Sequence, residues 1–179
     1  MAWDSDFRRP DKSALTPAQE AGLAALFRAI QPSDPERGIP GADEAGAAHF
    51  VGLLLARDPD GPVRIHPDLA AWQNAYPGWL AELETIAQGR FSVSLADCDV
   101  GQAGELIAAL EGGTLKGFSG DQGKAFGTLW RHCLQGCWSD PRWGGNRDRI
   151  MWRWLGHLYD PQNVVIADAE GGDRHAPVR

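Results

Sequence analysis

Three residues in the C-terminal half of the chain carry side chains that could bind a metal ion: His132, Cys133 and Cys137. Because Cys133 and Cys137 are four residues apart, a helix would place both thiols on one face. His132 would point about 100° away from Cys133 around the same helix, and no nearby Cys-x-x-Cys or histidine pair completes a tetrahedral set. A core-facing pair of thiols is therefore the favoured interpretation. A small, independent helical enzyme with a metal at these residues is kept as an alternative.

The other side chains that could carry out chemistry are scattered. The five histidines form no ligand pair on one helix face. The glycine-rich stretch 117–123 lacks the Lys-Ser/Thr ending of a phosphate-binding loop, and no dinucleotide-binding fingerprint occurs. Isolated acids such as Asp140 and Asp148 are more often caps or surface charges than general bases. The sequence therefore predicts no catalytic, metal-binding or cofactor-binding residue on this chain.

Composition limits the class of protein and its partners. The chain has 179 residues, of which 43% are hydrophobic, and this is long enough for one domain with its own core. Its net charge of -7 argues against nucleic acid or an anionic membrane surface as the main partner. No stretch is long and apolar enough to span a bilayer. Five of the eight tryptophans fall between residues 130 and 154, and tryptophan is common both in cores and at interface anchors.

Helix signals recur along the chain. Thr16 and Gln19 form a capping box before the first apolar run, which Pro32 ends. A second helix is predicted from Ala42 through Leu55, and a third begins at residue 66, is interrupted at Pro77 and resumes until residue 89. Later runs at helical spacing have the predicted core faces Ala103, Leu106, Ile107 and Leu110; Phe126, Leu129, Trp130, Cys133, Leu134 and Cys137; and Met151, Trp154, Leu155 and Leu158.

These elements predict an all-α fold. We expect a single compact domain over residues 1–179, built of five to seven helices, with a C-terminal helix-turn-helix corner and an irregular tail. Residues 1–14 and 167–179 are expected to be loosely ordered or ordered only with a partner.

The most distinctive segment covers residues 136–148 and reads Gly-Cys-Trp-Ser-Asp-Pro-Arg-Trp-Gly-Gly-Asn-Arg-Asp. Pro141 stops the preceding helix, and Gly144 and Gly145 permit positive φ angles. Asn146 is a preferred N-cap residue for the next helix. The segment therefore predicts a helix that ends at a Ser-Asp-Pro turn, crosses a Gly-Gly hinge and restarts at an asparagine cap.

This order of residues, continued by Trp152 and Gly156, resembles the signature of the gluconate 2-dehydrogenase subunit 3 family. A weaker likeness lies upstream, in Phe91, Leu95, Gln102 and the Leu-Glu-Gly at residues 110–112. Trp143 departs from the pattern, because the family more usually has tyrosine there.

The resemblance implies a role within a complex. Members of the family are small subunits of FAD-dependent sugar and polyol dehydrogenases. It implies that this chain is non-catalytic and stabilises and matures a large flavoprotein subunit of the glucose–methanol–choline type, which acts on a sugar, sugar acid or glycoside. FAD is then expected on the large subunit and no cofactor on this chain. In many relatives a cytochrome c subunit accepts the electrons. A free-standing helical binding module is the other alternative.

The resemblance also points to the corner as a partner interface. Trp138 would lie about 100° beyond Cys137, outside the apolar stripe, and Trp152 would flank the Met151 face. A tryptophan in such a place either covers a neighbouring helix or marks an interface. The predicted interface residues are Trp138, Asp140, Pro141, Trp143, Gly144, Gly145, Asn146, Arg147 and Trp152.

The cellular compartment is left open. Arg8 and Arg9 look like a twin-arginine export motif, but Pro10 follows and no apolar region comes next. Relatives in the family commonly carry such a signal. We expect a cytoplasmic chain if the sequence is full length, and a periplasmic chain if an export signal was removed or is supplied by the partner.

Overall fold

The computed structural model describes residues 10–61 and 66–156. Within them regular structure is helical, apart from an isolated antiparallel bridge between Asp34 and Ile39, and the predicted all-α class is confirmed. The α-helices are α2 (Pro17–Ile30), α3 (Ala42–Ala45), α4 (Ala47–Leu55), α5 (Leu69–Phe91), α6 (Val100–Glu111), α7 (Gln122–Trp138) and α8 (Ile150–Trp154). The 3-10 helices are η1 (Leu95–Asp97), η2 (Pro141–Trp143) and η3 (Arg147–Arg149). The end segments predicted to be loose lie outside the described residues, except for residues 10–14.

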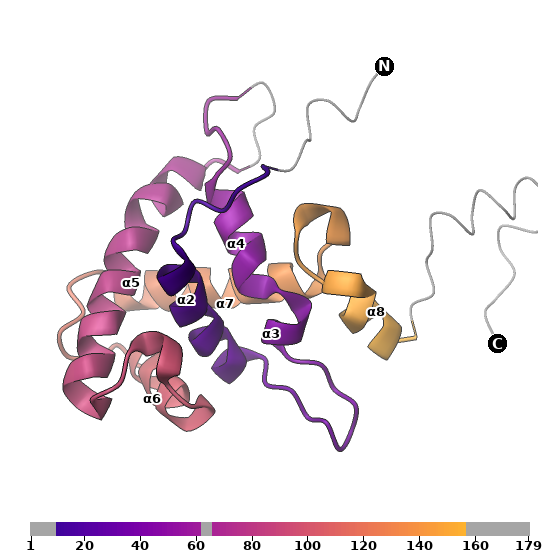
Figure 1. The fold of residues 1–179 in the computed structure, drawn as a ribbon. Coiled ribbons are helices and arrows are strands. Elements are labelled where there is room, and N and C mark those ends of the chain that lie inside the picture. Colours follow the sequence, from indigo (N-terminus) through magenta and orange to yellow (C-terminus); the bar gives the residue numbers. More distant parts are fainter. Residues whose placement is uncertain (1–9, 62–65, 157–179) are drawn as a thin grey trace, which may run out of the picture.

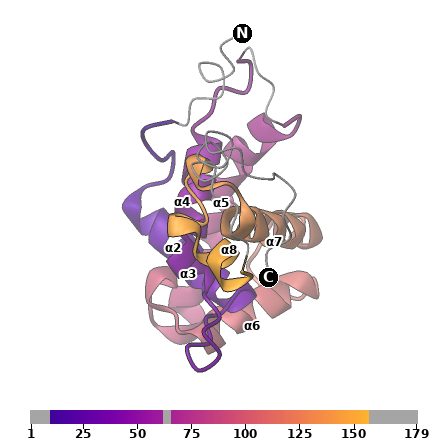
Figure 2. The same ribbon diagram turned by 90° about the vertical axis from the view of Figure 1, so that its right-hand side faces the viewer.

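Helix α2 is central to the packing. It contacts α6, η1, α4 and α7, and α7 crosses behind α2 and α4 in Figure 1. Helices α5 and α8 lie at opposite ends of the helical assembly, and Figure 2 looks onto the α8 end. The fully buried side chains Leu23, Leu26 and Phe27 of α2 belong to one hydrophobic cluster that continues into the other helices. None of the described helices is long and apolar enough to cross a bilayer.

The predicted start of α2 is confirmed. The Thr16 hydroxyl accepts from the Gln19 N–H at 3.2 Å, and the Gln19 side chain accepts from the Thr16 N–H at 3.0 Å. This capping box satisfies two backbone donors that the first turn of a helix leaves without partners.

The single helix predicted from Ala42 through Leu55 is wrong, because the structure has two helices there. Gly46 ends α3 with a φ of +70°, a left-handed conformation that glycine adopts without steric cost. Its N–H still bonds to carbonyl groups of α3. Helix α4 begins directly after the break, and its first residue, Ala47, lies against Gly136 of α7.

The predicted interruption at Pro77 is also wrong, because α5 continues through this residue. Proline removes one hydrogen bond from a helix and costs about 3 kcal/mol there. Pro77 is exposed, whereas Tyr76 and Leu80 beside it are almost completely buried, as are Trp72 and Leu83 on the same face. Burial of one large apolar side chain contributes about 1.5–3 kcal/mol, so burial of this face outweighs the penalty.

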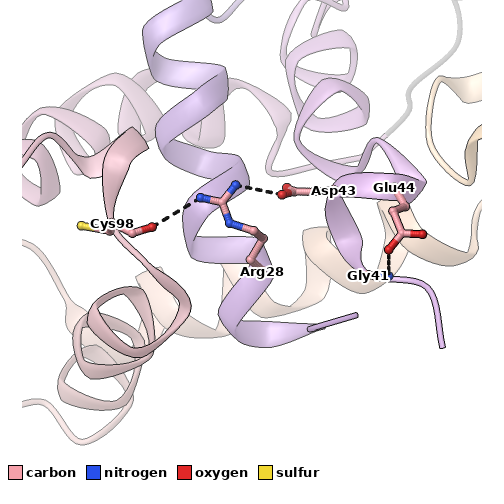
Figure 3. Close-up of polar contacts among 5 residues, drawn as sticks. All are labelled: Arg28, Gly41, Asp43, Glu44 and Cys98. Carbon is pink, nitrogen blue, oxygen red and sulfur yellow. Dashed lines mark hydrogen bonds and ion pairs between the residues drawn. The ribbon is translucent and has the colours of Figure 1, made fainter. Parts of the chain in front are cut away.

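Arg28 of α2 connects two neighbouring segments (Figure 3). Its guanidinium lies 2.8 Å from the Asp43 carboxylate of α3 and donates to the Cys98 carbonyl oxygen at 3.4 Å, just before α6. Both partners of the ion pair are more than a third exposed, so its net contribution to stability is small. Its main effect is to hold α3 in place beside α2.

Candidate partner interface at the corner between α7 and α8

The corner begins where α7 touches α4. A Cβ atom added to Gly136 would lie 2.7 Å from the Cα and 2.9 Å from the Cβ of Ala47. The two helix backbones therefore approach more closely than any side chain at this position would allow. This contact fixes the end of α7 against the start of α4.

The turn after α7 has the predicted chemistry. The Asp140 carboxylate accepts from the Arg142 backbone N–H at 2.9 Å, and Pro141 occupies the first position of η2. Gly144 follows with a φ of +97°, and a Cβ atom there would overlap with the Leu53 side chain. The Asp-Pro turn and the first glycine of the hinge are therefore needed for the path of the chain.

Asn146 connects the turn to both helices. It is completely buried, its backbone N–H donates to the Gly136 carbonyl at 2.7 Å, and its side-chain oxygen accepts from the Met151 N–H at 3.0 Å. It thus satisfies a first-turn donor of α8, as a cap would, although η3 separates it from that helix. A Cβ atom on Gly145 would overlap with the same Gly136 carbonyl, so the second glycine of the hinge is required as well.

The backbone after Asn146 adopts an uncommon conformation. Asn146, Asp148 and Arg149 have φ angles of 41°, 53° and 57°. Asparagine and aspartate visit this left-handed region readily, whereas arginine pays about 1–2 kcal/mol. Such conformations persist where the surrounding contacts hold them and are frequent at functional sites.

The three tryptophans of the predicted interface are half-buried within the chain. Trp138 packs against the core, and its carbonyl oxygen accepts from the Trp152 indole N–H at 3.1 Å. The Trp143 ring lies beneath the Arg57 guanidinium, 5.1 Å from the ring centre, with Arg142 at 5.9 Å. The structure therefore brings these residues together in one corner, where they hold the turn; their role in binding a partner stays a prediction.

The most exposed large apolar side chains at the corner are not among the predicted interface residues. Trp154 and Leu155 are 42% and 60% exposed, whereas Met151 is fully buried. The prediction that Trp154 and Leu155 face the core is wrong, because α8 has only five residues and buries its first two, Ile150 in part and Met151 completely, against the core. Leu158 lies outside the described residues. Of the predicted interface residues, Arg147 is exposed, while Gly145 and Asn146 are buried.

Trp130 of α7 was likewise predicted on the core face and is 47% exposed, so this prediction is also wrong. The buried stripe is rotated toward Thr128 and His132, which are 4% and 0% exposed. A stripe centred there turns Trp130 outward, because successive helical residues are separated by about 100°.

The structure does not bring His132 and the two cysteines into one site. The Cys133 thiol lies 3.9 Å from the Phe27 carbonyl oxygen and, with no disulfide formed, shares a hydrogen bond with the free thiol of Cys137. That hydrogen bond, together with burial, raises the pKa of Cys133. His132 instead approaches α5, where its Nδ1 lies 2.7 Å from the Tyr76 hydroxyl. Within residues 10–61 and 66–156, no three His, Cys, Asp or Glu side chains are grouped to hold a metal ion.

The pairing of Tyr76 with His132 was not found by sequence reasoning. Trp72 packs edge-on against the His132 ring at 4.4 Å. Burial, aided by the positive charge of Arg131 and by His66, lowers the pKa of His132 to about 4. One feature of the sequence could have indicated that His132 is buried. It lies one helical turn after Thr128 and Leu129, and so on the same face of α7 as these buried residues.

The described residues thus form an all-α fold. Its most distinctive feature is the corner between α7 and α8, where tryptophan and arginine side chains surround a turn of unusual backbone conformation. The family model of gluconate 2-dehydrogenase subunit 3 matches residues 17–157, from the first residue of α2 to just beyond α8. The chain therefore belongs to the gluconate 2-dehydrogenase subunit 3 family. The resemblance seen mainly in the last third of the sequence is confirmed and extends over the helical core. No curated protein and no solved structure compared with the chain matches it.

Proposed function

We propose that this chain is the non-catalytic small subunit of an FAD-dependent dehydrogenase complex, and that it stabilises and helps to mature a large flavoprotein subunit of the glucose–methanol–choline type. The substrate would be a sugar, a sugar acid or a glycoside. FAD on the large subunit would take the electrons and pass them to an acceptor, in the fuller complex a cytochrome c subunit. Membership of the subunit 3 family over residues 17–157 carries the proposal.

The fold of the described residues supports placing the flavin on the partner. Dinucleotide cofactors bind in α/β proteins at the carboxyl ends of parallel strands, beside a glycine-rich turn. Residues 10–61 and 66–156 are arranged as helices joined by loops. Two of the three candidate metal ligands, His132 and Cys133, are fully buried and contact different helices, α5 and α2 respectively.

The proposal is tested by co-expressing the chain with a flavoprotein subunit of this type encoded in the same genome. We expect the two chains to purify together as a yellow complex that reduces a dye when the right sugar is added. The isolated chain should be colourless and inactive. A flavin absorption band or sugar oxidation by the isolated chain would overturn the proposal.

Two further outcomes separate the alternatives. A chain that purifies alone, in the presence of a folded flavoprotein, would favour a free-standing binding module. Stoichiometric zinc or another transition metal in the purified isolated chain would favour the metal-dependent enzyme.

The stabilising role has its own measurement. A partner that binds only the folded chain stabilises it by about 2.7 kcal/mol when the free partner is at 100 times the dissociation constant. The melting temperatures of both subunits should therefore be higher in the complex than apart. Equal melting temperatures together and apart, with equal elution in gel filtration, would contradict an interaction.

A further inference from the structure

Two grooves border the short helix α3, and each has a corner arginine in its wall. The first, of about 540 Å³, lies among α2, α3 and α4 and is lined by Glu20, Asp43, Gly46, His49 and Arg147, with small apolar residues between them. The second, of about 410 Å³, lies between the loop before α3 and α8 and is lined by Ile39, Pro40, Glu44, Ile150, Arg153 and Trp154. Helix α8, which forms one side of the second groove, lies toward the viewer in Figure 2.

The carboxylates that α3 contributes to these grooves already have partners. Asp43 forms the ion pair with Arg28 at 2.8 Å, and Glu44 accepts from the Gly41 N–H at 3.2 Å, as Figure 3 shows. These contacts lie within one helix turn or between α2 and α3. Both carboxylates therefore already have hydrogen-bond or ion-pair partners within the chain.

The remaining charges of the grooves show an imbalance. Glu20 is hydrogen-bonded to His49 at 3.0 Å, so the carboxylates lining both grooves are engaged. Arg147 and Arg153 are exposed, and the guanidinium group of neither has a hydrogen-bond or ion-pair partner in the part of the chain that the structure describes. Among the charged groups that line the two grooves, the charge left without a partner is therefore positive, in a chain whose net charge is -7.

Exposed apolar surface lies beside these arginines. Trp154 and Leu155, at the end of α8, are consecutive and 42% and 60% exposed. The Trp154 ring lies 6.3 Å from the Trp138 ring, which packs on the core. One side of the exposed Trp154 ring therefore contacts the rest of the chain. Tryptophan and arginine together are the side chains most enriched among the residues that dominate binding energy at protein interfaces.

We propose that these two grooves form one docking surface for the large flavoprotein subunit, with Arg147, Arg153, Trp154 and Leu155 as its contact residues. Arg147 and Arg153 bind carboxylates of the partner, and Trp154 packs against one of its apolar side chains. The inference rests on the proposed function for the identity of the partner. The chemistry of the occupant follows from the charges: an anionic group fits the two unpaired arginines, since guanidinium and carboxylate form strong, often bidentate, hydrogen bonds.

A protein fits this surface better than a lipid bilayer. A helix that lies in a membrane interface presents a long apolar face with basic residues along its opposite side. Helix α8 has five residues, and the surface is hollowed on both sides of α3 rather than being a flat helical face. Concave surfaces of this kind accept protruding side chains of a partner.

The test measures binding of the full chain to the purified flavoprotein subunit by the wild type and matched variants. Trp154→Ala and Arg147→Glu should each weaken binding about tenfold or more. Trp130→Ala removes an equally exposed tryptophan (47%) from the middle of α7, and Arg131→Glu reverses an exposed charge beside it. Both controls should stay within about twofold of the wild type. Raising the ionic strength should weaken the wild type more than Arg147→Glu.

The outcomes separate this inference from the proposed function. A wild-type chain that fails to bind the flavoprotein contradicts the proposed function. Wild-type binding that the corner variants retain, or that the two controls lose equally, overturns the docking surface and leaves the proposed function standing. Circular dichroism checks that each variant is folded, and Leu155→Glu and Arg153→Glu replace any variant that is not. Binding to phosphatidylglycerol vesicles that Trp154→Ala abolishes would assign the surface to a membrane and overturn the protein partner.

Discussion

The contact between α5 and α7 and the corner between α7 and α8 use similar residue types in opposite ways. At the first, Tyr76 and His132 are completely buried and hydrogen-bonded to each other at 2.7 Å, and Trp72 packs against the His132 ring. At the corner, Trp154 is 42% exposed and the exposed Arg147 guanidinium has no hydrogen-bond or ion-pair partner among the described residues. An aromatic or basic residue therefore forms a core contact in one region and part of the proposed docking surface in the other, and the burial of its side chain distinguishes the two.

The two regions also differ in what determines their shape. The α5–α7 contact depends on side chains that fill space between helices. The corner depends on close backbone approaches, at Gly136 and Gly145, and on the buried amide of Asn146. A single added methyl group should therefore damage the corner, whereas a change of protonation should damage the α5–α7 contact.

The largest effect is expected from Gly136→Ala. The new Cβ would lie 2.7 Å from the Ala47 Cα, and both atoms belong to helix backbones that cannot move independently. We expect a loss of about 3 kcal/mol or more in the free energy of unfolding. Gly127→Ala on the same helix is the matched control, because a Cβ there meets nothing within 4 Å. It should gain about 0.5–1 kcal/mol from helix propensity. Chemical denaturation measures both, and equal values would disprove the close approach of α7 to α4.

Asn146→Ala should have the next largest effect. It leaves the buried Met151 N–H without its acceptor and places alanine at a φ of 41°, so we expect a loss of about 2–3 kcal/mol. Asn146→Gly removes the acceptor but permits the backbone, and should lose less. Asn74→Ala, at an exposed position of α5, should change the free energy of unfolding by about 0.5 kcal/mol or less. An Asn146→Ala variant as stable as the wild type would show that the amide does not hold the corner.

A change of pH tests the α5–α7 contact. The pKa of His132 is lowered to about 4 in the folded chain, against about 6.5 when unfolded. Between these values the unfolded chain binds the extra proton, so stability is complete above pH 6.5 and falls as the pH drops toward 4. Going from pH 7 to pH 5 should lower the free energy of unfolding by about 2 kcal/mol through this group alone.

The variants His132→Gln and Tyr76→Phe isolate that contribution. His132→Gln removes the titrating group, so its free energy of unfolding should change less between pH 7 and pH 5 than that of the wild type. Tyr76→Phe keeps the buried imidazole and should retain the pH dependence, because burial is the main cause of the lowered pKa. Identical pH profiles for His132→Gln and the wild type would refute the assignment.

The parts of the fold that local residues determine could be predicted from the sequence. The capping box of Thr16 and Gln19 and the Asp-Pro turn at residue 141 depend on neighbours in the chain. The break at Gly46 and the continuation of α5 through Pro77 do not. Each is decided by packing against residues far along the sequence, the first by the approach of α7 and the second by burial of Tyr76.

At the candidate interface, the sequence predicted which residues shape the turn of the backbone. It did not predict which side chains are exposed to solvent. Gly144 has the positive φ that its type permits, and Asn146 supplies the predicted capping oxygen to the next helix. The positive φ predicted for Gly145 is wrong, because this glycine is needed for its close approach to the Gly136 carbonyl. The orientation of Trp130 and Trp154 depends on which neighbour occupies each side of their helices. Helical periodicity alone cannot supply this, because a face with several apolar residues can be rotated by one position, as happens where His132 is buried.

The smallest effect on stability, and the sharpest comparison within the corner, is expected from Trp154→Ala beside Trp138→Ala. The Trp138 ring packs on the core, so its loss should cost the free chain about 1–2 kcal/mol, less than a completely buried tryptophan would. Trp154 is 42% exposed, so its removal should change the free energy of unfolding by only about 0.5 kcal/mol. Circular dichroism and thermal melting of the free chain measure the cost to the fold, and pull-down of the flavoprotein measures binding. Loss of binding by a stable Trp154→Ala chain would separate docking from folding. A Trp154→Ala chain that melts as early as Trp138→Ala would instead make Trp154 part of the core, and the contrast between the two regions would not hold at this residue.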